Sequence, residues 1–155
     1  MKYRQLTKEQ FESLHHEFAQ FLATQKIDVN EWNNIKETNP KLAEEELNLF
    51  SDLVWEDVLS KIEYLEHFSK NSINLFKTEE ESISRIVVQV HKEVDLLSKE
   101  GYEWLLKNPK DDSVEYFKGN KEYQTNRNEE LFDLIEKGSQ ISKGELFEYF
   151  NRLTS

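Results

Sequence analysis

Apolar residues near the start of the chain recur three or four positions apart, which is the spacing of one helix face. Between residues 7 and 25 these positions are Phe11, Leu14, Phe18, Phe21 and Leu22. Thr7 with Gln10 three residues later is typical of a capping box, and Leu6 can pack on Phe11 across the helix start. The pattern predicts a helix over 7–25.

Two further helices are predicted from similar patterns. Asp28 can cap a short helix over 28–37, and Pro40 fits the first turn of the next helix, where its missing N–H costs nothing. From Pro40 onward no Gly or Pro appears until Gly101. Large apolar residues occur at nearly every turn up to residue 69, so we expect a long central helix over 40–69, buried along most of its circumference.

The middle of the chain supports two interpretations. Residues 72–77 (SINLFK) are short and roughly alternating, which is typical of a strand. Residues 83–91 match a helical face and follow a second capping box, Thr78 with Glu81, so a helix is favoured there. The alternative is a strand, because ISRIVVQV is rich in β-branched residues and could form a hairpin with 72–77 across the acidic turn TEEES.

In the last third of the sequence the starts and ends of the predicted elements are clearer. A short helix is predicted from Ser98 to just before Pro109, and 113–118 is predicted as a strand that could pair with 72–77. The stretch 118–128 lacks aliphatic residues and is predicted as a loop. Two helices should follow, one ending at Gly138 and one opened by a capping box of Ser142 and Glu145.

These elements together predict a mainly α-helical fold. We expect one domain over 1–155, a compact multi-helix structure around the central helix 40–69, with a small two- or three-stranded sheet. An α+β fold is the alternative if 83–91 forms a strand.

Composition narrows the classes of partner. The chain has 155 residues and a net charge of −11, with 37% apolar and 33% charged residues. Such a charge repels phosphate backbones and anionic lipids, so neither nucleic acid nor a membrane is expected as a partner. The chain has no cysteine, which excludes thiolate chemistry and disulfides. Its first residues carry no apolar stretch of the signal-peptide kind, so a cytoplasmic protein is expected.

A row of acids is the most conspicuous polar feature of the predicted central helix. Glu45, Asp52, Glu56 and Glu63 fall together on a helical wheel, opposite the apolar direction. We interpret this row as a solvated face and as a candidate interaction surface, because a helix usually meets water opposite its buried face.

A metal site is the alternative interpretation of the acidic and histidine residues. Carboxylate di-metal bundles use a Glu-x-x-His unit on each of two helices. Only Glu12 and His15 provide one, and Glu63 with His67 is a pair four residues apart. We therefore assign no catalytic, cofactor or metal residue, and keep these four as the alternative of a metal-dependent helical enzyme.

No motif in the sequence indicates phosphate binding. The four glycines are isolated, whereas phosphate-cradling loops need them clustered. Lys118, Lys121, Tyr123 and Arg127 form a weak basic and aromatic patch that we interpret as part of a solvated loop. We expect a non-enzymatic protein-interaction or adaptor domain without a cofactor, whose partner is another protein or a further copy in a homo-oligomer. An acidic mimic of nucleic acid is a further alternative.

Five short stretches of the sequence, taken together, resemble a known family of proteins. KYRQLTKEQF, EEEL, YLEHFSK, INLFK and KEGYEWL together resemble a small family of uncharacterised bacterial proteins, conserved hypotheticals or a domain of unknown function, chiefly from Bacteroidota. The similarity covers nearly the whole length. It implies a stand-alone single-domain bacterial protein, and it implies no activity, cofactor or site residue.

Overall fold

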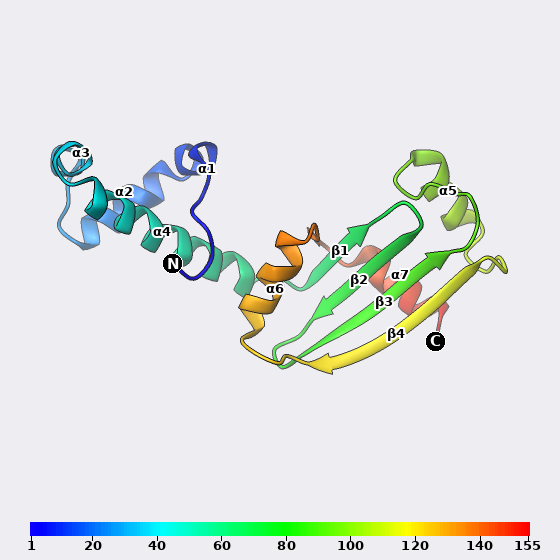
Figure 1. Ribbon diagram of the computed structural model, residues 1–155. Helices are drawn as coiled ribbons and strands as arrows, with labels where there is room; N and C mark the ends of the chain where they lie inside the picture. Colours follow the sequence, from blue (N-terminus) through cyan, green and yellow to red (C-terminus); the bar gives the residue numbers. More distant parts are fainter. The chain divides into compact units, whose positions relative to one another are not determined.

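The computed structural model describes residues 1–155 and shows seven helices and five strands (Figure 1). The chain divides into two compact units, Met1–Ser60 and Lys61–Ser155. We call them unit 1 and unit 2 and describe each by itself. None of the helices combines the length and the apolar character that crossing a membrane requires.

Unit 1 is entirely helical. Its helices are α1 (Lys8–Ser13), α2 (His15–Thr24), α3 (Val29–Thr38) and α4 (Pro40–Ser60). The predicted single helix over 7–25 is therefore two helices, because Leu14 leaves helical geometry at φ −106° and ψ 22° and ends α1. The predicted caps are confirmed: Thr7 and Gln10 form a capping box, and the Asp28 carboxylate accepts the Glu31 N–H at 2.8 Å.

Aromatic rings form much of the interior of unit 1. The Phe18 ring lies 5.0 Å from the Phe50 ring and 5.2 Å from the Trp32 ring, and Phe21 lies 5.5 Å from Phe50. Ring pairs at such distances add to the stabilisation from burial alone. Helix α4 is less enclosed than predicted, because Leu53 keeps 57% of its surface exposed.

The predicted helix over 40–69 is wrong beyond Ser60, where α4 ends. Residues Tyr64–Phe68 form strand β1 instead. Leu65 and Phe68 match a helical face by spacing, but they lie on opposite faces of the sheet, and Leu65 is buried with 1% exposure. The backbone of β1 pairs with strands on both sides, and this pairing overrides the local helical pattern.

Unit 2 is built on a five-stranded antiparallel sheet in the order β4-β3-β2-β1-β5. The remaining strands are β2 (Ser72–Thr78), β3 (Ser82–Val90), β4 (Val114–Glu122) and β5 (Gln140–Ser142). Its helices are α5 (Lys99–Lys107), α6 (Arg127–Glu136) and α7 (Glu145–Leu153). The mainly α prediction with a small sheet is therefore wrong, and the fold is α+β.

The favoured helix over 83–91 is also wrong, and its alternative holds. Residues 82–90 form β3, a hairpin partner of β2 across the acidic turn. Ile86, Val88 and Val90 are buried at alternate positions, as a strand requires, and their β-branched side chains suit it. The predicted strand at 72–77 is confirmed as β2.

The strand predicted at 113–118 is confirmed, but its partner and length differ from the prediction. It pairs with β3 rather than with 72–77, and it continues to Glu122 into the stretch predicted as a loop. Residues 118–122 lack aliphatic side chains because they form an exposed part of an edge strand.

The three helices predicted in the last third are confirmed, with one wrong cap. The Ser98 hydroxyl accepts the Gly101 N–H at 3.0 Å, as expected of a cap. Ser142, however, belongs to β5, and Gly144 precedes α7 at φ +85° without a side-chain cap. A residue with a side chain is disfavoured at that angle, which explains glycine at this position.

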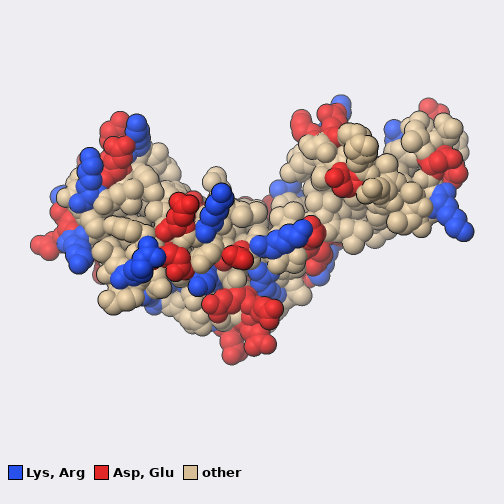
Figure 2. All heavy atoms as spheres, turned by 180° about the vertical axis from the view of Figure 1, so that it is seen from behind, with Lys and Arg blue, Asp and Glu red and all other residues tan.

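The two faces of the sheet are covered differently (Figure 1). On one face, here called the α7 face, α7 and α5 enclose the main core. Its fully buried members include Ile73, Leu75, Val88, Leu105 and Phe150. On the other, here called the α6 face, α6 covers only one end. Figure 2 views unit 2 from the α7 side and shows charges of both signs interspersed over it.

Candidate functional site

A groove of about 650 Å³ lies where α6 crosses the α6 face of the sheet. All of the residues that line it belong to unit 2. They are His67, Asn74, Phe76, Ile83, Arg85, Gly119, Asn120, Lys121, Tyr123, Glu130, Asp133, Leu134, Lys137 and Ser139. A concave site of this size is in the range that proteins use for ligands and short segments of partners.

The floor of the groove comes from alternate residues of neighbouring strands. Phe76 and Ile83 supply its apolar part and keep only 8% and 6% of their surfaces exposed. The Arg85 guanidinium lies 5.7 Å from the centre of the Phe76 ring, and its Nε donates to the Asn74 side-chain oxygen at 3.0 Å. These contacts hold a cation in a defined position above an aromatic floor.

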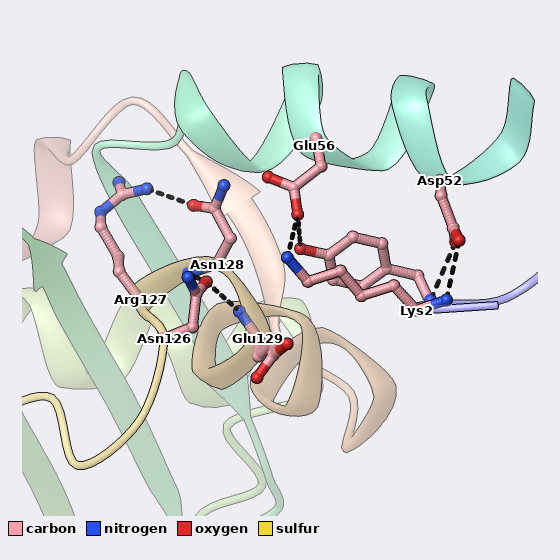
Figure 3. A network of polar contacts seen from close by, with 8 residues as sticks. Lys2, Asp52, Glu56, Asn126, Arg127, Asn128 and Glu129 are labelled. Atoms are coloured by element: carbon pink, nitrogen blue, oxygen red, sulfur yellow. Dashed lines mark hydrogen bonds and ion pairs between the residues drawn. The ribbon is translucent and has the colours of Figure 1, made fainter. Parts of the chain in front are cut away.

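The opposite wall is one stripe of α6. Glu130, Asp133, Leu134 and Lys137 are spaced as i, i+3, i+4 and i+7, which places them along the same side of the helix. The Asn126 side chain caps this helix by accepting the N–H groups of Asn128 at 3.0 Å and Glu129 at 3.3 Å (Figure 3). This cap fixes the residue at which α6, and with it this wall of the groove, begins.

Arg127 ties the start of α6 to the sheet. Its guanidinium donates to the carbonyl oxygens of Ile62 at 2.6 Å and Glu79 at 3.1 Å. The Tyr123 hydroxyl donates to the same Glu79 carbonyl at 2.9 Å, and burial raises the pKa of this phenol. Together these bonds anchor the start of α6 beside the ends of β1 and β2.

The far end of the α6 wall depends on a glycine. Gly138 follows α6 at φ +115°, and a Cβ there would lie 3.1 Å from Nε2 of His67. The Ser139 N–H, one residue on, donates to the Leu134 carbonyl at 2.9 Å and closes the helix end. This close approach lets the His67 ring line the groove beside the helix end.

The charge of the groove differs from that of the whole chain. Arg85, Lys121 and Lys137 supply three cations, against the two carboxylates of Glu130 and Asp133. The balance is locally positive within a chain of net charge −11. The lining therefore offers binding groups of both signs, and no hydrogen bond joins His67 to a hydroxyl or a carboxylate.

The predicted acidic row does not lie together on one wet helix face. Asp52 accepts the backbone N–H groups of Lys2 at 2.7 Å and Tyr3 at 2.9 Å (Figure 3). Glu56 accepts the Tyr3 hydroxyl and pairs with the Lys2 ammonium at 2.9 Å. These two acids therefore hold the first residues of the chain against α4. Glu45 is exposed on α4, and Glu63 lies outside it, just before β1.

The four residues of the metal alternative lie in different units. His15 packs against His16, with ring centres 4.6 Å apart, and its Nδ1 lies 3.0 Å from the Glu12 carbonyl oxygen. Glu63 and His67 belong to unit 2, where the second lies in β1 rather than one turn along a helix. No three His, Cys, Asp or Glu side chains are grouped so that they could hold a metal ion.

Two of the four residues in the basic and aromatic patch predicted from the sequence line the groove. Lys121 and Tyr123 line it, whereas Arg127 is the anchor of α6 and Lys118 projects from the α7 face of β4. Asn74 and Arg85 were missed, because only the pairing of β2 with β3 brings them together. The one sequence signal for them was the alternative hairpin.

The comparisons place the chain without assigning it an activity. No curated protein and no solved structure matches it. The sequence does match one family over its full length, which confirms the resemblance to uncharacterised proteins. By this match over residues 1–155, the chain belongs to a family of unknown function, DUF6495.

Proposed function

We propose that this protein is a non-enzymatic interaction domain that holds an extended segment of a partner protein in the groove between α6 and the sheet. The observation that carries the proposal is the partly uncovered α6 face, with buried apolar residues beside polar and charged side chains. Segments of partner proteins dock on apolar floors with polar rims in this way.

The charges of the groove indicate what such a segment would carry. Acidic side chains would meet Arg85 and Lys121 on the sheet side, and a basic side chain would meet Glu130 and Asp133 on α6. An apolar residue between them would cover the Phe76 floor. Charge pairing of this kind selects the partner and its orientation more than it raises affinity.

Site-specific photo-crosslinking tests this proposal in cells that express the protein naturally. A photoreactive residue at Lys121 should give an adduct with one partner protein, because this side chain borders the groove. The matched control is Lys107, an exposed lysine of α5 on the other side of the sheet. The same residue at Lys107 should not capture that partner.

Charge reversal then identifies the docking residues. Arg85→Glu should abolish the Lys121 adduct, whereas Lys107→Glu should leave it unchanged, with circular dichroism confirming that both variants fold. Loss of the adduct in both variants, or capture of the same protein from Lys107, would contradict docking in the groove.

A further inference from the structure

The two edge strands of the sheet differ in length and in the number of backbone N–H and C=O groups that they leave unpaired. At one edge β5 contributes only three residues, Gln140–Ser142. At the other, β4 runs for nine residues and pairs with β3 along all of them, without a bulge and without proline (Figure 1). Short strands, bulges, prolines and charged side chains, especially lysine, are devices that protect an edge from pairing further. β5 is protected by its shortness, whereas β4 has only the charged side chains, among them Lys118 and Lys121, and none of the other three devices.

The backbone of β4 offers a regular row of unused hydrogen-bonding groups. The His91 N–H donates to the Ser113 carbonyl at 2.7 Å, and the Tyr123 N–H donates to the Glu81 carbonyl at 3.3 Å. These bonds show that the odd-numbered residues of β4 bond to β3. The N–H and C=O groups of Tyr116, Lys118 and Asn120 therefore point away from the sheet, since direction alternates along an antiparallel strand.

A half-exposed phenylalanine lies near the centre of this edge. Phe117 keeps 50% of its surface exposed, on the α6 face opposite Val87 of β3. A Cβ added at Gly119, the next residue on the same face, would meet no atom within 4 Å, so there is open space beside the ring. The edge thus combines free backbone groups with an apolar side chain that a further strand would cover.

We propose that β4 pairs antiparallel with β4 of a second copy of this chain, with the two-fold axis between the two Phe117 residues. The axis makes the interface self-complementary, as symmetric dimers require. Because residue 117 bonds inward, the two rings would face each other at a non-hydrogen-bonded position, where side chains approach most closely. The two sheets would continue as one.

The charges of β4 favour this register. Glu115 of each copy would lie opposite Gly119 and diagonal to Lys121 of the other, within reach of an ion pair. Tyr116 would lie opposite Lys118, and their outward N–H and C=O groups would form the new hydrogen bonds. A register shifted by one residue along each strand would instead place Lys118 opposite Lys118, and like charges directly opposite are unfavourable.

Disulfide trapping tests the pairing and its register at once, since the chain has no cysteine of its own. In this register only residue 117 lies opposite the same residue of the second copy. Phe117→Cys should therefore give a disulfide-linked dimer under mild oxidation. Glu115→Cys and Lys121→Cys lie on the same face of the same strand and are the matched controls. Equal trapping at all three positions, or none at residue 117, would overturn the proposal.

Sedimentation velocity on the full chain provides the second readout. Lys118→Pro removes an N–H that β3 does not use, so the variant should fold while losing two hydrogen bonds of the dimer. Its dissociation constant should rise about tenfold or more. Lys118→Thr keeps the N–H and should still dimerise. A wild-type chain that stays monomeric at every concentration would overturn the proposal.

Discussion

The two faces of the sheet in unit 2 have opposite surroundings, although the same strands build both. On the α7 face, most positions of β2 and β3 are aliphatic, and helices cover them until Ile73, Val88 and Phe150 lose all exposure. On the α6 face the corresponding positions include Asn74, Arg85 and polar groups of β4. Apolar burial is the main source of stability, so the α7 face should stabilise the fold and leave the α6 face available for binding.

The largest expected effect is the loss of a ring from the α7 face. Phe150→Ala removes a fully buried side chain whose ring lies 5.8 Å from Tyr116 and 4.9 Å from Tyr149. It should lower the free energy of unfolding by about 3–5 kcal/mol, measured by chemical denaturation. The control Phe117→Ala removes the same side chain from the α6 face and should cost less than about 1 kcal/mol. Similar losses would remove the distinction between the faces.

A smaller effect is expected from a methyl group at the start of α7. Gly144 has φ +85°, and a Cβ there would lie 2.4 Å from the Tyr64 ring. Gly144→Ala should therefore cost about 2 kcal/mol in thermal or chemical unfolding, from the backbone angle and the displaced ring together. Gly119→Ala places the same methyl group in open space and should change stability by no more than about 0.5 kcal/mol. Equal costs at both glycines would contradict this account.

The smallest expected effect appears only at high pH. Burial, and then the neighbouring Tyr149, raise the pKa of Tyr116 on the α7 face to about 12. Between the ordinary pKa of tyrosine, about 10, and this value, the unfolded chain releases the proton while the folded chain keeps it. Stability should therefore fall as the pH rises through this window, and the ionisation of Tyr116 should not affect it at lower pH.

The matched variant for this effect is Tyr116→Phe, which has no proton to lose. Its unfolding free energy should decline less steeply between about pH 10 and pH 12 than that of the wild type. The same slope in both proteins would show that Tyr116 is not shielded on the α7 face.

Local cap signals predicted the structure correctly at three helix starts, but the capping boxes predicted at Thr78 and Ser142 fall in strands β2 and β5. The caps at Thr7, Asp28 and Ser98 act within a few residues of themselves, and all three were predicted correctly. The strands β1 and β3 were assigned to helices because their apolar residues also satisfy a helical spacing. Only pairing with segments elsewhere in the chain decides between the two, and periodicity does not contain that information.

The groove could not be predicted from the sequence either, because it too depends on pairing between distant segments. Its lining side chains come from four strands, α6 and the segments that flank this helix, and Phe76, Arg85 and Lys121 become neighbours only through the β2–β3–β4 register. The four acids do not share one helix, because α4 ends at Ser60, nine residues before the predicted end. Asp52 and Glu56 in turn bind the chain's own first residues, a contact that helical spacing does not predict.

Two consecutive valines of β3 give the most direct test of the difference between the faces. Val88 is fully buried on the α7 face, and Val87 is partly exposed on the α6 face, so the same substitution can be made on each side. By chemical denaturation, Val88→Ala should lower the unfolding free energy by at least about 1 kcal/mol more than Val87→Ala does. Equal losses, or a larger loss at Val87, would contradict the assignment of stability to the α7 face.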